Sequence, residues 1–158
     1  MSPVGENVMQ PNAGEAIGAG ILAIAISLSI HAVFMFATLK LQLALRERFP
    51  ALKGIKLIIP SILLPTALIV TSTVIQICIW GVIANQTGHF ESFRDAAYFA
   101  GMTYHTLGAD AQLTIPYRVF EPLMAMNGML TTGLNTAILF AIISNMGKDK
   151  SQLRQVFQ

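Results

Sequence analysis

The chain has 158 residues, of which 54% are hydrophobic and only 11% are charged, and its formal net charge is +2. So few charges cannot solvate a globular surface, whereas runs of about 20 apolar residues are what a hydrocarbon core of roughly 30 Å requires. The chain contains three such runs, so we expect an all-α integral membrane protein. No metal-binding Cys/His spacing, phosphate loop or nucleic-acid patch occurs, so we expect neither an enzyme, nor a resident cofactor, nor a nucleic-acid partner.

The first membrane span is expected at residues 17–39. Residues 1–16 contain prolines and glycines but no Lys or Arg, so they predict a short flexible lead and not a secretory signal. His31 is the only ionisable side chain of the span, and an ionisable group within the membrane is a functional candidate. A neutral imidazole that hydrogen-bonds to a neighbouring helix is the favoured interpretation.

A basic segment, residues 40–56, follows the first span and contains five basic residues but only one acidic residue. Residues 40–48 are expected to extend the first helix, and Phe49-Pro50 is expected to end it because proline disfavours helix at the residue before it. Residues 17–56 together are expected to form one unit, an additional amino-terminal membrane helix followed by its basic linker. By the positive-inside rule, the linker lies in the cytoplasm.

The second and third spans are expected at residues 57–84 and 118–146. Within the second span, Gln76 is expected to bond to another helix and Trp80 to lie at the membrane surface. The tail, residues 147–158, is short and basic. Eight of the ten basic residues then lie on the cytoplasmic side, which predicts an external amino terminus and a cytoplasmic carboxyl terminus.

The segment between these two spans, residues 91–110, predicts a re-entrant pore loop. Ser92-Phe93-Arg94-Asp95 has the pattern of a capping box, which predicts a helix over 92–105 of roughly 20 Å, too short to cross the membrane. Residues 106–110 then lead back outward. Non-helical backbone at membrane depth is tolerated only where it is buried in protein or lines water, and four copies around one axis would satisfy that condition.

Several short motifs here match a known family: Ala97-Tyr98-Phe99, Thr103, Thr106-Leu107-Gly108 and Asp110, followed by a helix with glycines. Through them, residues 96–143 resemble the pore module of the potassium-channel superfamily, in particular small bacterial two-pore-domain-type proteins. The resemblance implies an outer helix, pore helix, filter and inner helix, in a homotetramer of the inner membrane. The implied filter is Thr106, Leu107, Gly108, Ala109 and Asp110, with the permeant cation, K⁺ or Na⁺, held at the first three.

The filter departs from the family pattern, Thr-Val/Leu-Gly-Tyr/Phe-Gly-Asp. Only Ala109 stands in place of Tyr-Gly, so the filter is one residue shorter and lacks both its aromatic brace and a glycine able to adopt a left-handed conformation. His105, at the filter base, replaces the usual threonine. It is either a group that titrates near physiological pH or a packing residue behind the filter. We therefore expect weak or no selectivity among monovalent cations.

Polar residues recur along the third span at Asn127, Thr131 and Asn135, which are spaced i, i+4 and i+8. A polar stripe of this kind either lines a water-filled cavity or forms hydrogen bonds between helices. The sequence leaves both interpretations open.

The same span contains candidates for a gate. Gly128 and Gly133 are either hinges, because glycine weakens a helix, or points of close helix packing. Ile138 and Ile142 lie nearer the cytoplasm, where apolar side chains close a pore by excluding water.

Together these features predict a homotetrameric channel for monovalent cations in a bacterial inner membrane. The alternative is a non-conducting membrane subunit that uses the same fold as an interaction scaffold. The expected partners of the protein are other copies of the same chain and the lipid bilayer. The first span either surrounds the pore or contacts another membrane protein.

Overall fold

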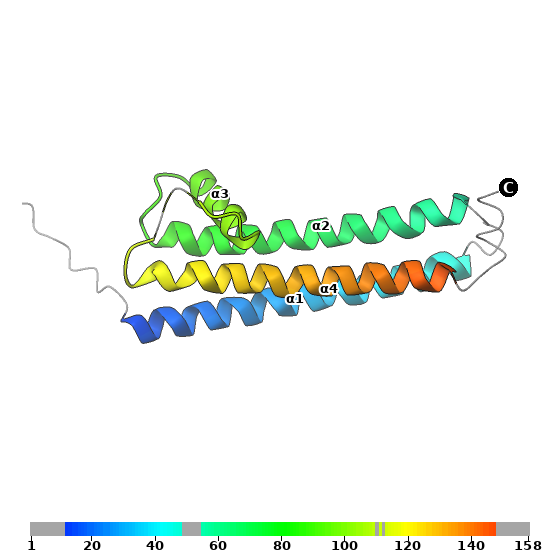
Figure 1. Cartoon of the computed structure of the whole chain (residues 1–158), viewed down its shortest axis with the longest axis horizontal. Helices are drawn as coiled ribbons and strands as arrows, with labels where there is room; N and C mark the ends of the chain where they lie inside the picture. The colour runs from blue at the N-terminus through cyan, green and yellow to red at the C-terminus, as the bar shows by residue number, and fades with distance from the viewer. Residues whose placement is uncertain (1–11, 49–54, 110, 112, 148–158) are drawn as a thin grey trace, which may run out of the picture.

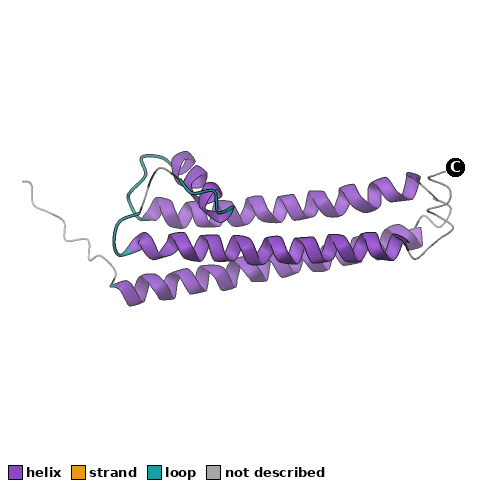
Figure 2. Cartoon of the chain, in the orientation of Figure 1, coloured by secondary structure: helices purple, strands orange, loops and turns teal. Residues whose placement is uncertain are grey.

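The computed structural model describes residues 12–48, 55–109, 111 and 113–147. In these residues every regular element is a helix, as Figures 1 and 2 show. The elements are α1 (Ala13–Arg48), α2 (Ile55–Gln86), α3 (Phe93–Tyr104), the short 3₁₀-helix η1 (Tyr117–Val119) and α4 (Phe120–Gly147).

Three of the helices, α1, α2 and α4, lie side by side and form an elongated bundle (Figure 1). Three stretches are long and apolar enough to cross a membrane: Ala13–Leu45 in α1, Ile58–Gln86 in α2, and Tyr117–Asn145, which comprises η1 and most of α4. The prediction of three membrane helices is therefore confirmed. The extension of the first helix over residues 40–48 is also confirmed, whereas Phe49 and Pro50 lie outside the described residues.

The start of α1 differs from the predicted flexible lead, because α1 already begins at Ala13. Asn12 and Glu15 cap this end reciprocally: the Glu15 backbone N–H donates to Asn12 Oδ1, and the Asn12 N–H donates to Glu15 Oε2, both at 2.9 Å. These bonds satisfy two amides that otherwise have no partner in the first turn. The predicted lead over residues 13–16 is therefore wrong.

The short helix α3 packs beside the last turns of α2, at the end of the bundle where α1 and α4 begin (Figure 1). A Cβ atom added to Gly81 of α2 would lie 2.9 Å from the Ala97 Cα atom of α3, so glycine permits this close approach. Trp80 is completely buried, in the same hydrophobic core as Phe99 and Tyr104. Trp80 therefore faces protein and neither lipid nor water, while its expected depth near the membrane surface stays a prediction.

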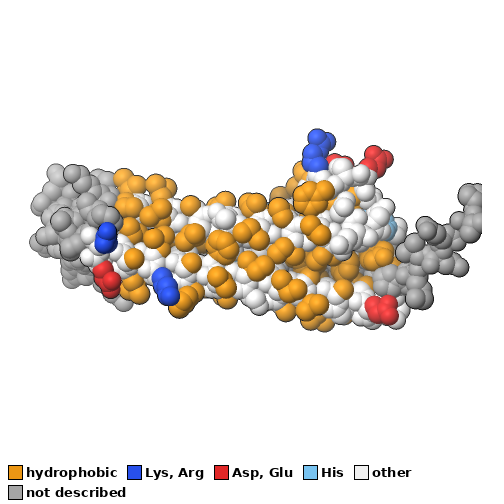
Figure 3. All heavy atoms as spheres, turned by 180° about the vertical axis from the view of Figure 1, so that it is seen from behind, with side chains coloured by type: hydrophobic (Ala, Val, Ile, Leu, Met, Phe, Trp, Pro, Cys, Tyr) orange, Lys and Arg blue, Asp and Glu red, His pale blue; other side chains and the backbone are white. Residues whose placement is uncertain are grey.

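Hydrophobic side chains cover the outside of the bundle between its two ends, and the charged side chains on the face in Figure 3 lie toward the ends. Val33 is 67% exposed, Phe36 60% and Phe140 70%. An apolar surface of this extent is unfavourable in water but is what a hydrocarbon environment requires.

Candidate functional site

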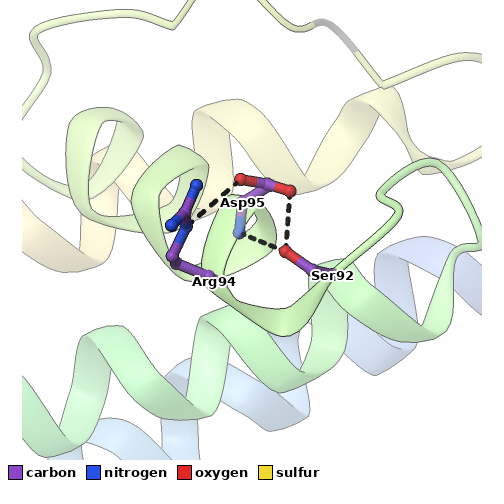
Figure 4. A network of polar contacts seen from close by, with 3 residues as sticks. All are labelled: Ser92, Arg94 and Asp95. Carbon is purple, nitrogen blue, oxygen red and sulfur yellow. Dashed lines mark hydrogen bonds and ion pairs between the residues drawn. The ribbon is translucent and has the colours of Figure 1, made fainter.

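The amino-terminal end of α3 is fixed by the predicted cap. Ser92 has an extended backbone, and its Oγ accepts a hydrogen bond from the Asp95 N–H at 3.3 Å. The Ser92 hydroxyl donates to Asp95 Oδ2 at 2.6 Å, so Asp95 reaches the side chain of Ser92 (Figure 4). Arg94 lies 3.8 Å from Asp95 in an exposed ion pair, which adds little stability. The predicted helix bounds, 92–105, agree with the observed α3 and its two caps.

The carboxyl-terminal end of α3 is a Schellman motif. The Leu107 N–H donates to the Met102 carbonyl and the Thr106 N–H donates to the Thr103 carbonyl, both at 2.9 Å. This motif places its C′ residue in the left-handed region, and glycine is the usual residue there. Here Thr106 occupies the position, with a φ of 59°. A β-branched residue in this conformation is strained, and such strain is concentrated at functional sites.

We expect Thr106→Gly to raise the free energy of unfolding by up to about 1 kcal/mol. The left-handed conformation costs a non-glycine residue roughly 1–2 kcal/mol, and glycine removes that cost. Part of the gain is lost again, because glycine loses more conformational entropy than other residues when the chain folds. Chemical unfolding in detergent measures the change. If the protein conducts ions and the threonine hydroxyl or its stiffness is needed for conduction, this more stable variant should show lower ion flux in liposomes. Unchanged ion flux in the variant would contradict a functional role for Thr106.

The predicted filter begins in this motif and is exposed in the single chain. His105, Thr106 and Gly108 are exposed, and Leu107 is 71% exposed. Gly108 also has a left-handed backbone, with a φ of 76°. Ala109 is half-buried against the hydrophobic core, and Asp110 lies outside the described residues. The first three filter residues, and His105 before them, are therefore exposed to whatever surrounds one copy of the chain.

The segment after the predicted filter is held at two successive backbone amides. The Leu113 N–H donates to the Glu121 carboxylate of α4 at 2.8 Å. The Thr114 N–H donates to His89 Nε2 at 3.3 Å, and the Thr114 hydroxyl also contacts that nitrogen. His89 belongs to the loop after α2. The polypeptide around residues 106–110 is thus anchored on both sides.

The end of α3 rests directly on α4 at Gly128. A Cβ atom added to Gly128 would lie 1.8 Å from the Tyr104 carbonyl oxygen, a distance that no real contact allows. Of the two interpretations of this glycine, the structure therefore places it at a point of close packing, and its hinge role stays a prediction. Gly133 has nothing within 4 Å of an added Cβ, so no such contact explains it.

A network of buried polar side chains connects all four α-helices beneath the predicted filter. Each member has at most 1% of its surface exposed. The members are Ser27 and His31 of α1, Ser72 and Gln76 of α2, Tyr104 of α3, and Asn127 and Thr131 of α4. As predicted, Gln76 bonds across helices and His31 contacts a neighbouring helix.

Tyr104 connects α3 to two other helices. Its hydroxyl donates to Gln76 Oε1 at 3.0 Å and lies 2.6 Å from Thr131 Oγ1. Because Tyr104 is the last residue of α3, these bonds fix the point from which the predicted filter departs.

The polar stripe of α4 faces its own chain. Asn127 Nδ2 donates to Ser27 Oγ at 2.7 Å, and Thr131 bonds to Tyr104, so both side chains form hydrogen bonds between helices. Asn135 is half-buried, and its Oδ1 has no hydrogen-bond partner among the described residues. For Asn127 and Thr131 the interhelical interpretation therefore describes the single chain, and cavity lining stays a prediction.

The two predicted gate residues are also turned inward. Ile138 and Ile142 are each 6% exposed, and Ile142 lines a pocket of about 310 Å³ between α1 and α4. The extra amino-terminal helix thus lies beside α4 at Ile142. Closure by these residues would require α1 and α4 to move relative to each other.

Sequence reasoning did not identify Ser27, Ser72 and Tyr104 as members of the buried network. Two of them are small hydroxyl residues within apolar helices, where serine usually bonds to its own backbone, as Ser29 does. The available signal was the presence of polar residues in all three spans and in α3, which would otherwise lie unpaired in an apolar environment. Among the described residues, no three His, Cys, Asp or Glu side chains come together.

Neither a family model, nor a curated protein, nor a solved structure was found to match this chain.

Proposed function

We propose that this protein is a homotetrameric channel for monovalent cations, of the kind whose pore module its sequence resembles. Each subunit contributes three membrane helices and one re-entrant loop, α3 with residues 105–110. The amino terminus lies outside the cell and the carboxyl terminus in the cytoplasm of a bacterium. The permeant ion, K⁺ or Na⁺, passes Thr106, Leu107 and Gly108.

The observation that carries this proposal is the exposed non-helical backbone at the end of α3. Tyr104, just before this segment, is bonded to Gln76. Gln76 and the end of α2 at Gln86 are separated by about 15 Å of helix, half of a hydrocarbon core of roughly 30 Å. Irregular backbone does not face lipid at that depth, so it needs further protein or water around it. Four copies around one axis supply both.

The orientation of α3 supports a cation as the ligand. Its carboxyl-terminal end lies toward the interior of the bundle and its capped amino-terminal end toward the loops (Figure 1). The dipole of a helix places partial negative charge at the carboxyl-terminal end. In a tetramer, four such ends would favour a cation near Thr106. With Ala109 in place of Tyr-Gly, we expect fewer ion sites and similar flux of K⁺ and Na⁺.

The test combines assembly with transport. The purified protein is sized by mass spectrometry from detergent, and then reconstituted into liposomes for K⁺ and Na⁺ flux measurements. A tetramer with comparable flux of both cations supports the proposal. Strong preference for K⁺ would refute the argument from the shortened filter. A monomer or dimer, or a tetramer without flux, would refute the channel.

The second candidate is the non-conducting scaffold subunit. One observation favours it: Asn127 and Thr131, the polar residues expected in a water-filled cavity, are 0% and 1% exposed and bonded within their own chain. In that case α3 and residues 105–109 would contact another membrane protein. Absence of flux from intact tetramers, together with co-purification of a defined membrane partner, would select this alternative.

His105 is the candidate for pH-dependent flux. It follows α3, is exposed beside Thr106, and its ring lies edge-on to Tyr104 with centroids 5.6 Å apart. A positive charge on His105 would repel cations at the base of the filter, so we expect lower flux at acidic pH. His105→Ala should flatten the profile of liposome flux between pH 5 and 8. An unchanged profile in that variant would rule out this role.

A further inference from the structure

The amide of Gln76 has one orientation that its neighbours allow. Its Nε2 lies 3.3 Å from the Ser72 backbone carbonyl, which can only accept a hydrogen bond, so this atom must be the NH₂ group. Its Oε1 lies 2.6 Å from Ser27 Oγ and 3.0 Å from Tyr104 Oη, and both hydroxyls can donate to it. A flipped amide would place two oxygens together at Ser72. The acceptor of Gln76 is therefore committed to α1 and α3.

This orientation favours one tautomer of His31. Gln76 Nε2, an obligate donor, lies 3.3 Å from His31 Nδ1 and can donate to it when Nδ1 carries a lone pair, while the Ser72 carbonyl and Ser72 Oγ compete for the same two hydrogens at 3.3 and 3.1 Å. Ser72 Oγ, at 3.3 Å from His31 Nδ1, is able to donate as well. In that tautomer of the neutral imidazole the proton is on Nε2, which has no hydrogen-bond partner among the described residues. Ser72 and Gln76, both uncharged, are the polar side chains that contact His31 among the described residues.

Gln76 Oε1 thus joins the first membrane helix to the carboxyl-terminal end of α3. We propose that Gln76 is a positioning residue for the predicted filter and that α1 supports the filter through it. Ser27 holds Gln76 Oε1 in place, and that atom holds Tyr104, from which residues 105–109 depart. The inference rests on the proposed function for its consequence, but its geometry can be tested separately. It makes α1 part of the pore's support.

The test uses two matched serines of α1. Ser27 bonds to Gln76, whereas Ser29 is exposed and bonds only to the Ala25 carbonyl of its own helix, at 2.7 Å. The full-length protein is reconstituted in nanodiscs, and amide hydrogen exchange is measured at Thr106 and Leu107. Ser27→Ala should accelerate exchange roughly fivefold, the factor expected for loss of one ordinary hydrogen bond. Ser29→Ala should leave it unchanged.

A double-mutant cycle separates this route from others. In a Gln76→Leu background, where the shared acceptor is absent, Ser27→Ala should have no further effect on exchange. If Ser27→Ala still accelerates exchange there, its effect travels through another contact, such as Asn127, and the proposal is overturned. Equal effects of Ser27→Ala and Ser29→Ala would overturn it too. Should Gln76→Leu fail to fold, Tyr104→Phe takes its place in the cycle, because it removes the hydrogen bond between Tyr104 and Gln76 Oε1.

Two further measurements complete the test. Nitrogen-15 NMR of the wild-type protein, assigned with His89→Gln and His105→Gln, should show the Nε2–H tautomer of His31. The Nδ1–H form would show that Gln76 donates to Ser72 and not to His31. In liposomes, Ser27→Ala should alter cation flux and Ser29→Ala should not. If wild-type protein conducts nothing, the proposed channel fails, yet the exchange results still decide whether Gln76 positions the loop.

Discussion

Gly128→Ala is expected to lower the free energy of unfolding by about 3 kcal/mol, at the upper end of the usual cost of overpacking. The added methyl would lie 1.8 Å from the Tyr104 carbonyl oxygen, a backbone atom that cannot turn aside as a flexible side chain can. Relief requires the end of α3 to move away from α4. That movement would also stretch the bonds from Tyr104 to Gln76 and Thr131. Thermal and chemical unfolding in detergent measure the loss.

Gly133→Ala is the matched control on the same helix. An added Cβ there meets nothing within 4 Å, and alanine is a better helix former than glycine by roughly 1 kcal/mol. This variant should be as stable as the wild type or slightly more so. If both substitutions lowered stability equally, the cost would come from helix flexibility, and the packing argument for Gly128 would be wrong.

Gly108→Ala is expected to cost about 1–2 kcal/mol of stability, because the left-handed conformation is unfavourable for any residue with a Cβ atom. Gly108 has a φ of 76°, and an added Cβ would meet no neighbour within 4 Å, so the cost is conformational and not steric. Residues 106–109 would relieve it by changing their backbone angles. If they form the filter, most cation flux in liposomes should be lost.

Gly88 provides the comparison for this effect. It lies in the loop after α2, has a φ of 75°, and likewise has nothing within 4 Å of an added Cβ. Gly88→Ala should therefore cost a similar free energy of unfolding and leave flux close to wild type. Loss of flux in both variants would indicate a general effect on folding, and retention in both would remove residues 106–109 from the conduction path.

Features that depend on neighbouring residues in the chain were predictable. The Ser92 and Asp95 pattern predicted the start of α3 because a cap involves residues three apart, and the observed helix begins at Phe93. Span positions followed from apolar runs, since a helix must satisfy its own backbone in lipid. The start of α1 was missed although Asn12 and Glu15 form a local cap, because proline and glycine nearby favoured a flexible lead.

Contacts between distant segments were not predictable in the same way. Trp80 was expected at the membrane surface, but α3 folds back over α2 and buries it. The spacing of Asn127 and Thr131 indicated one shared helix face, yet whether that face meets water or α1 depends on helix packing. The left-handed Thr106 was also unexpected, because glycine is the usual signal for the C′ position of a Schellman motif.

The sequence by itself determined the all-helical membrane architecture, the number of spans and the capped short helix, because hydrophobic length and local hydrogen bonding are properties of contiguous residues. Only the tertiary structure decided which polar groups pair. Gln76 takes its partners from residues 27, 31 and 104, and Gly128 meets the carbonyl of Tyr104. Buried polar groups require such partners, but composition and periodicity do not specify which helix supplies them. That choice places α1 beneath the predicted filter.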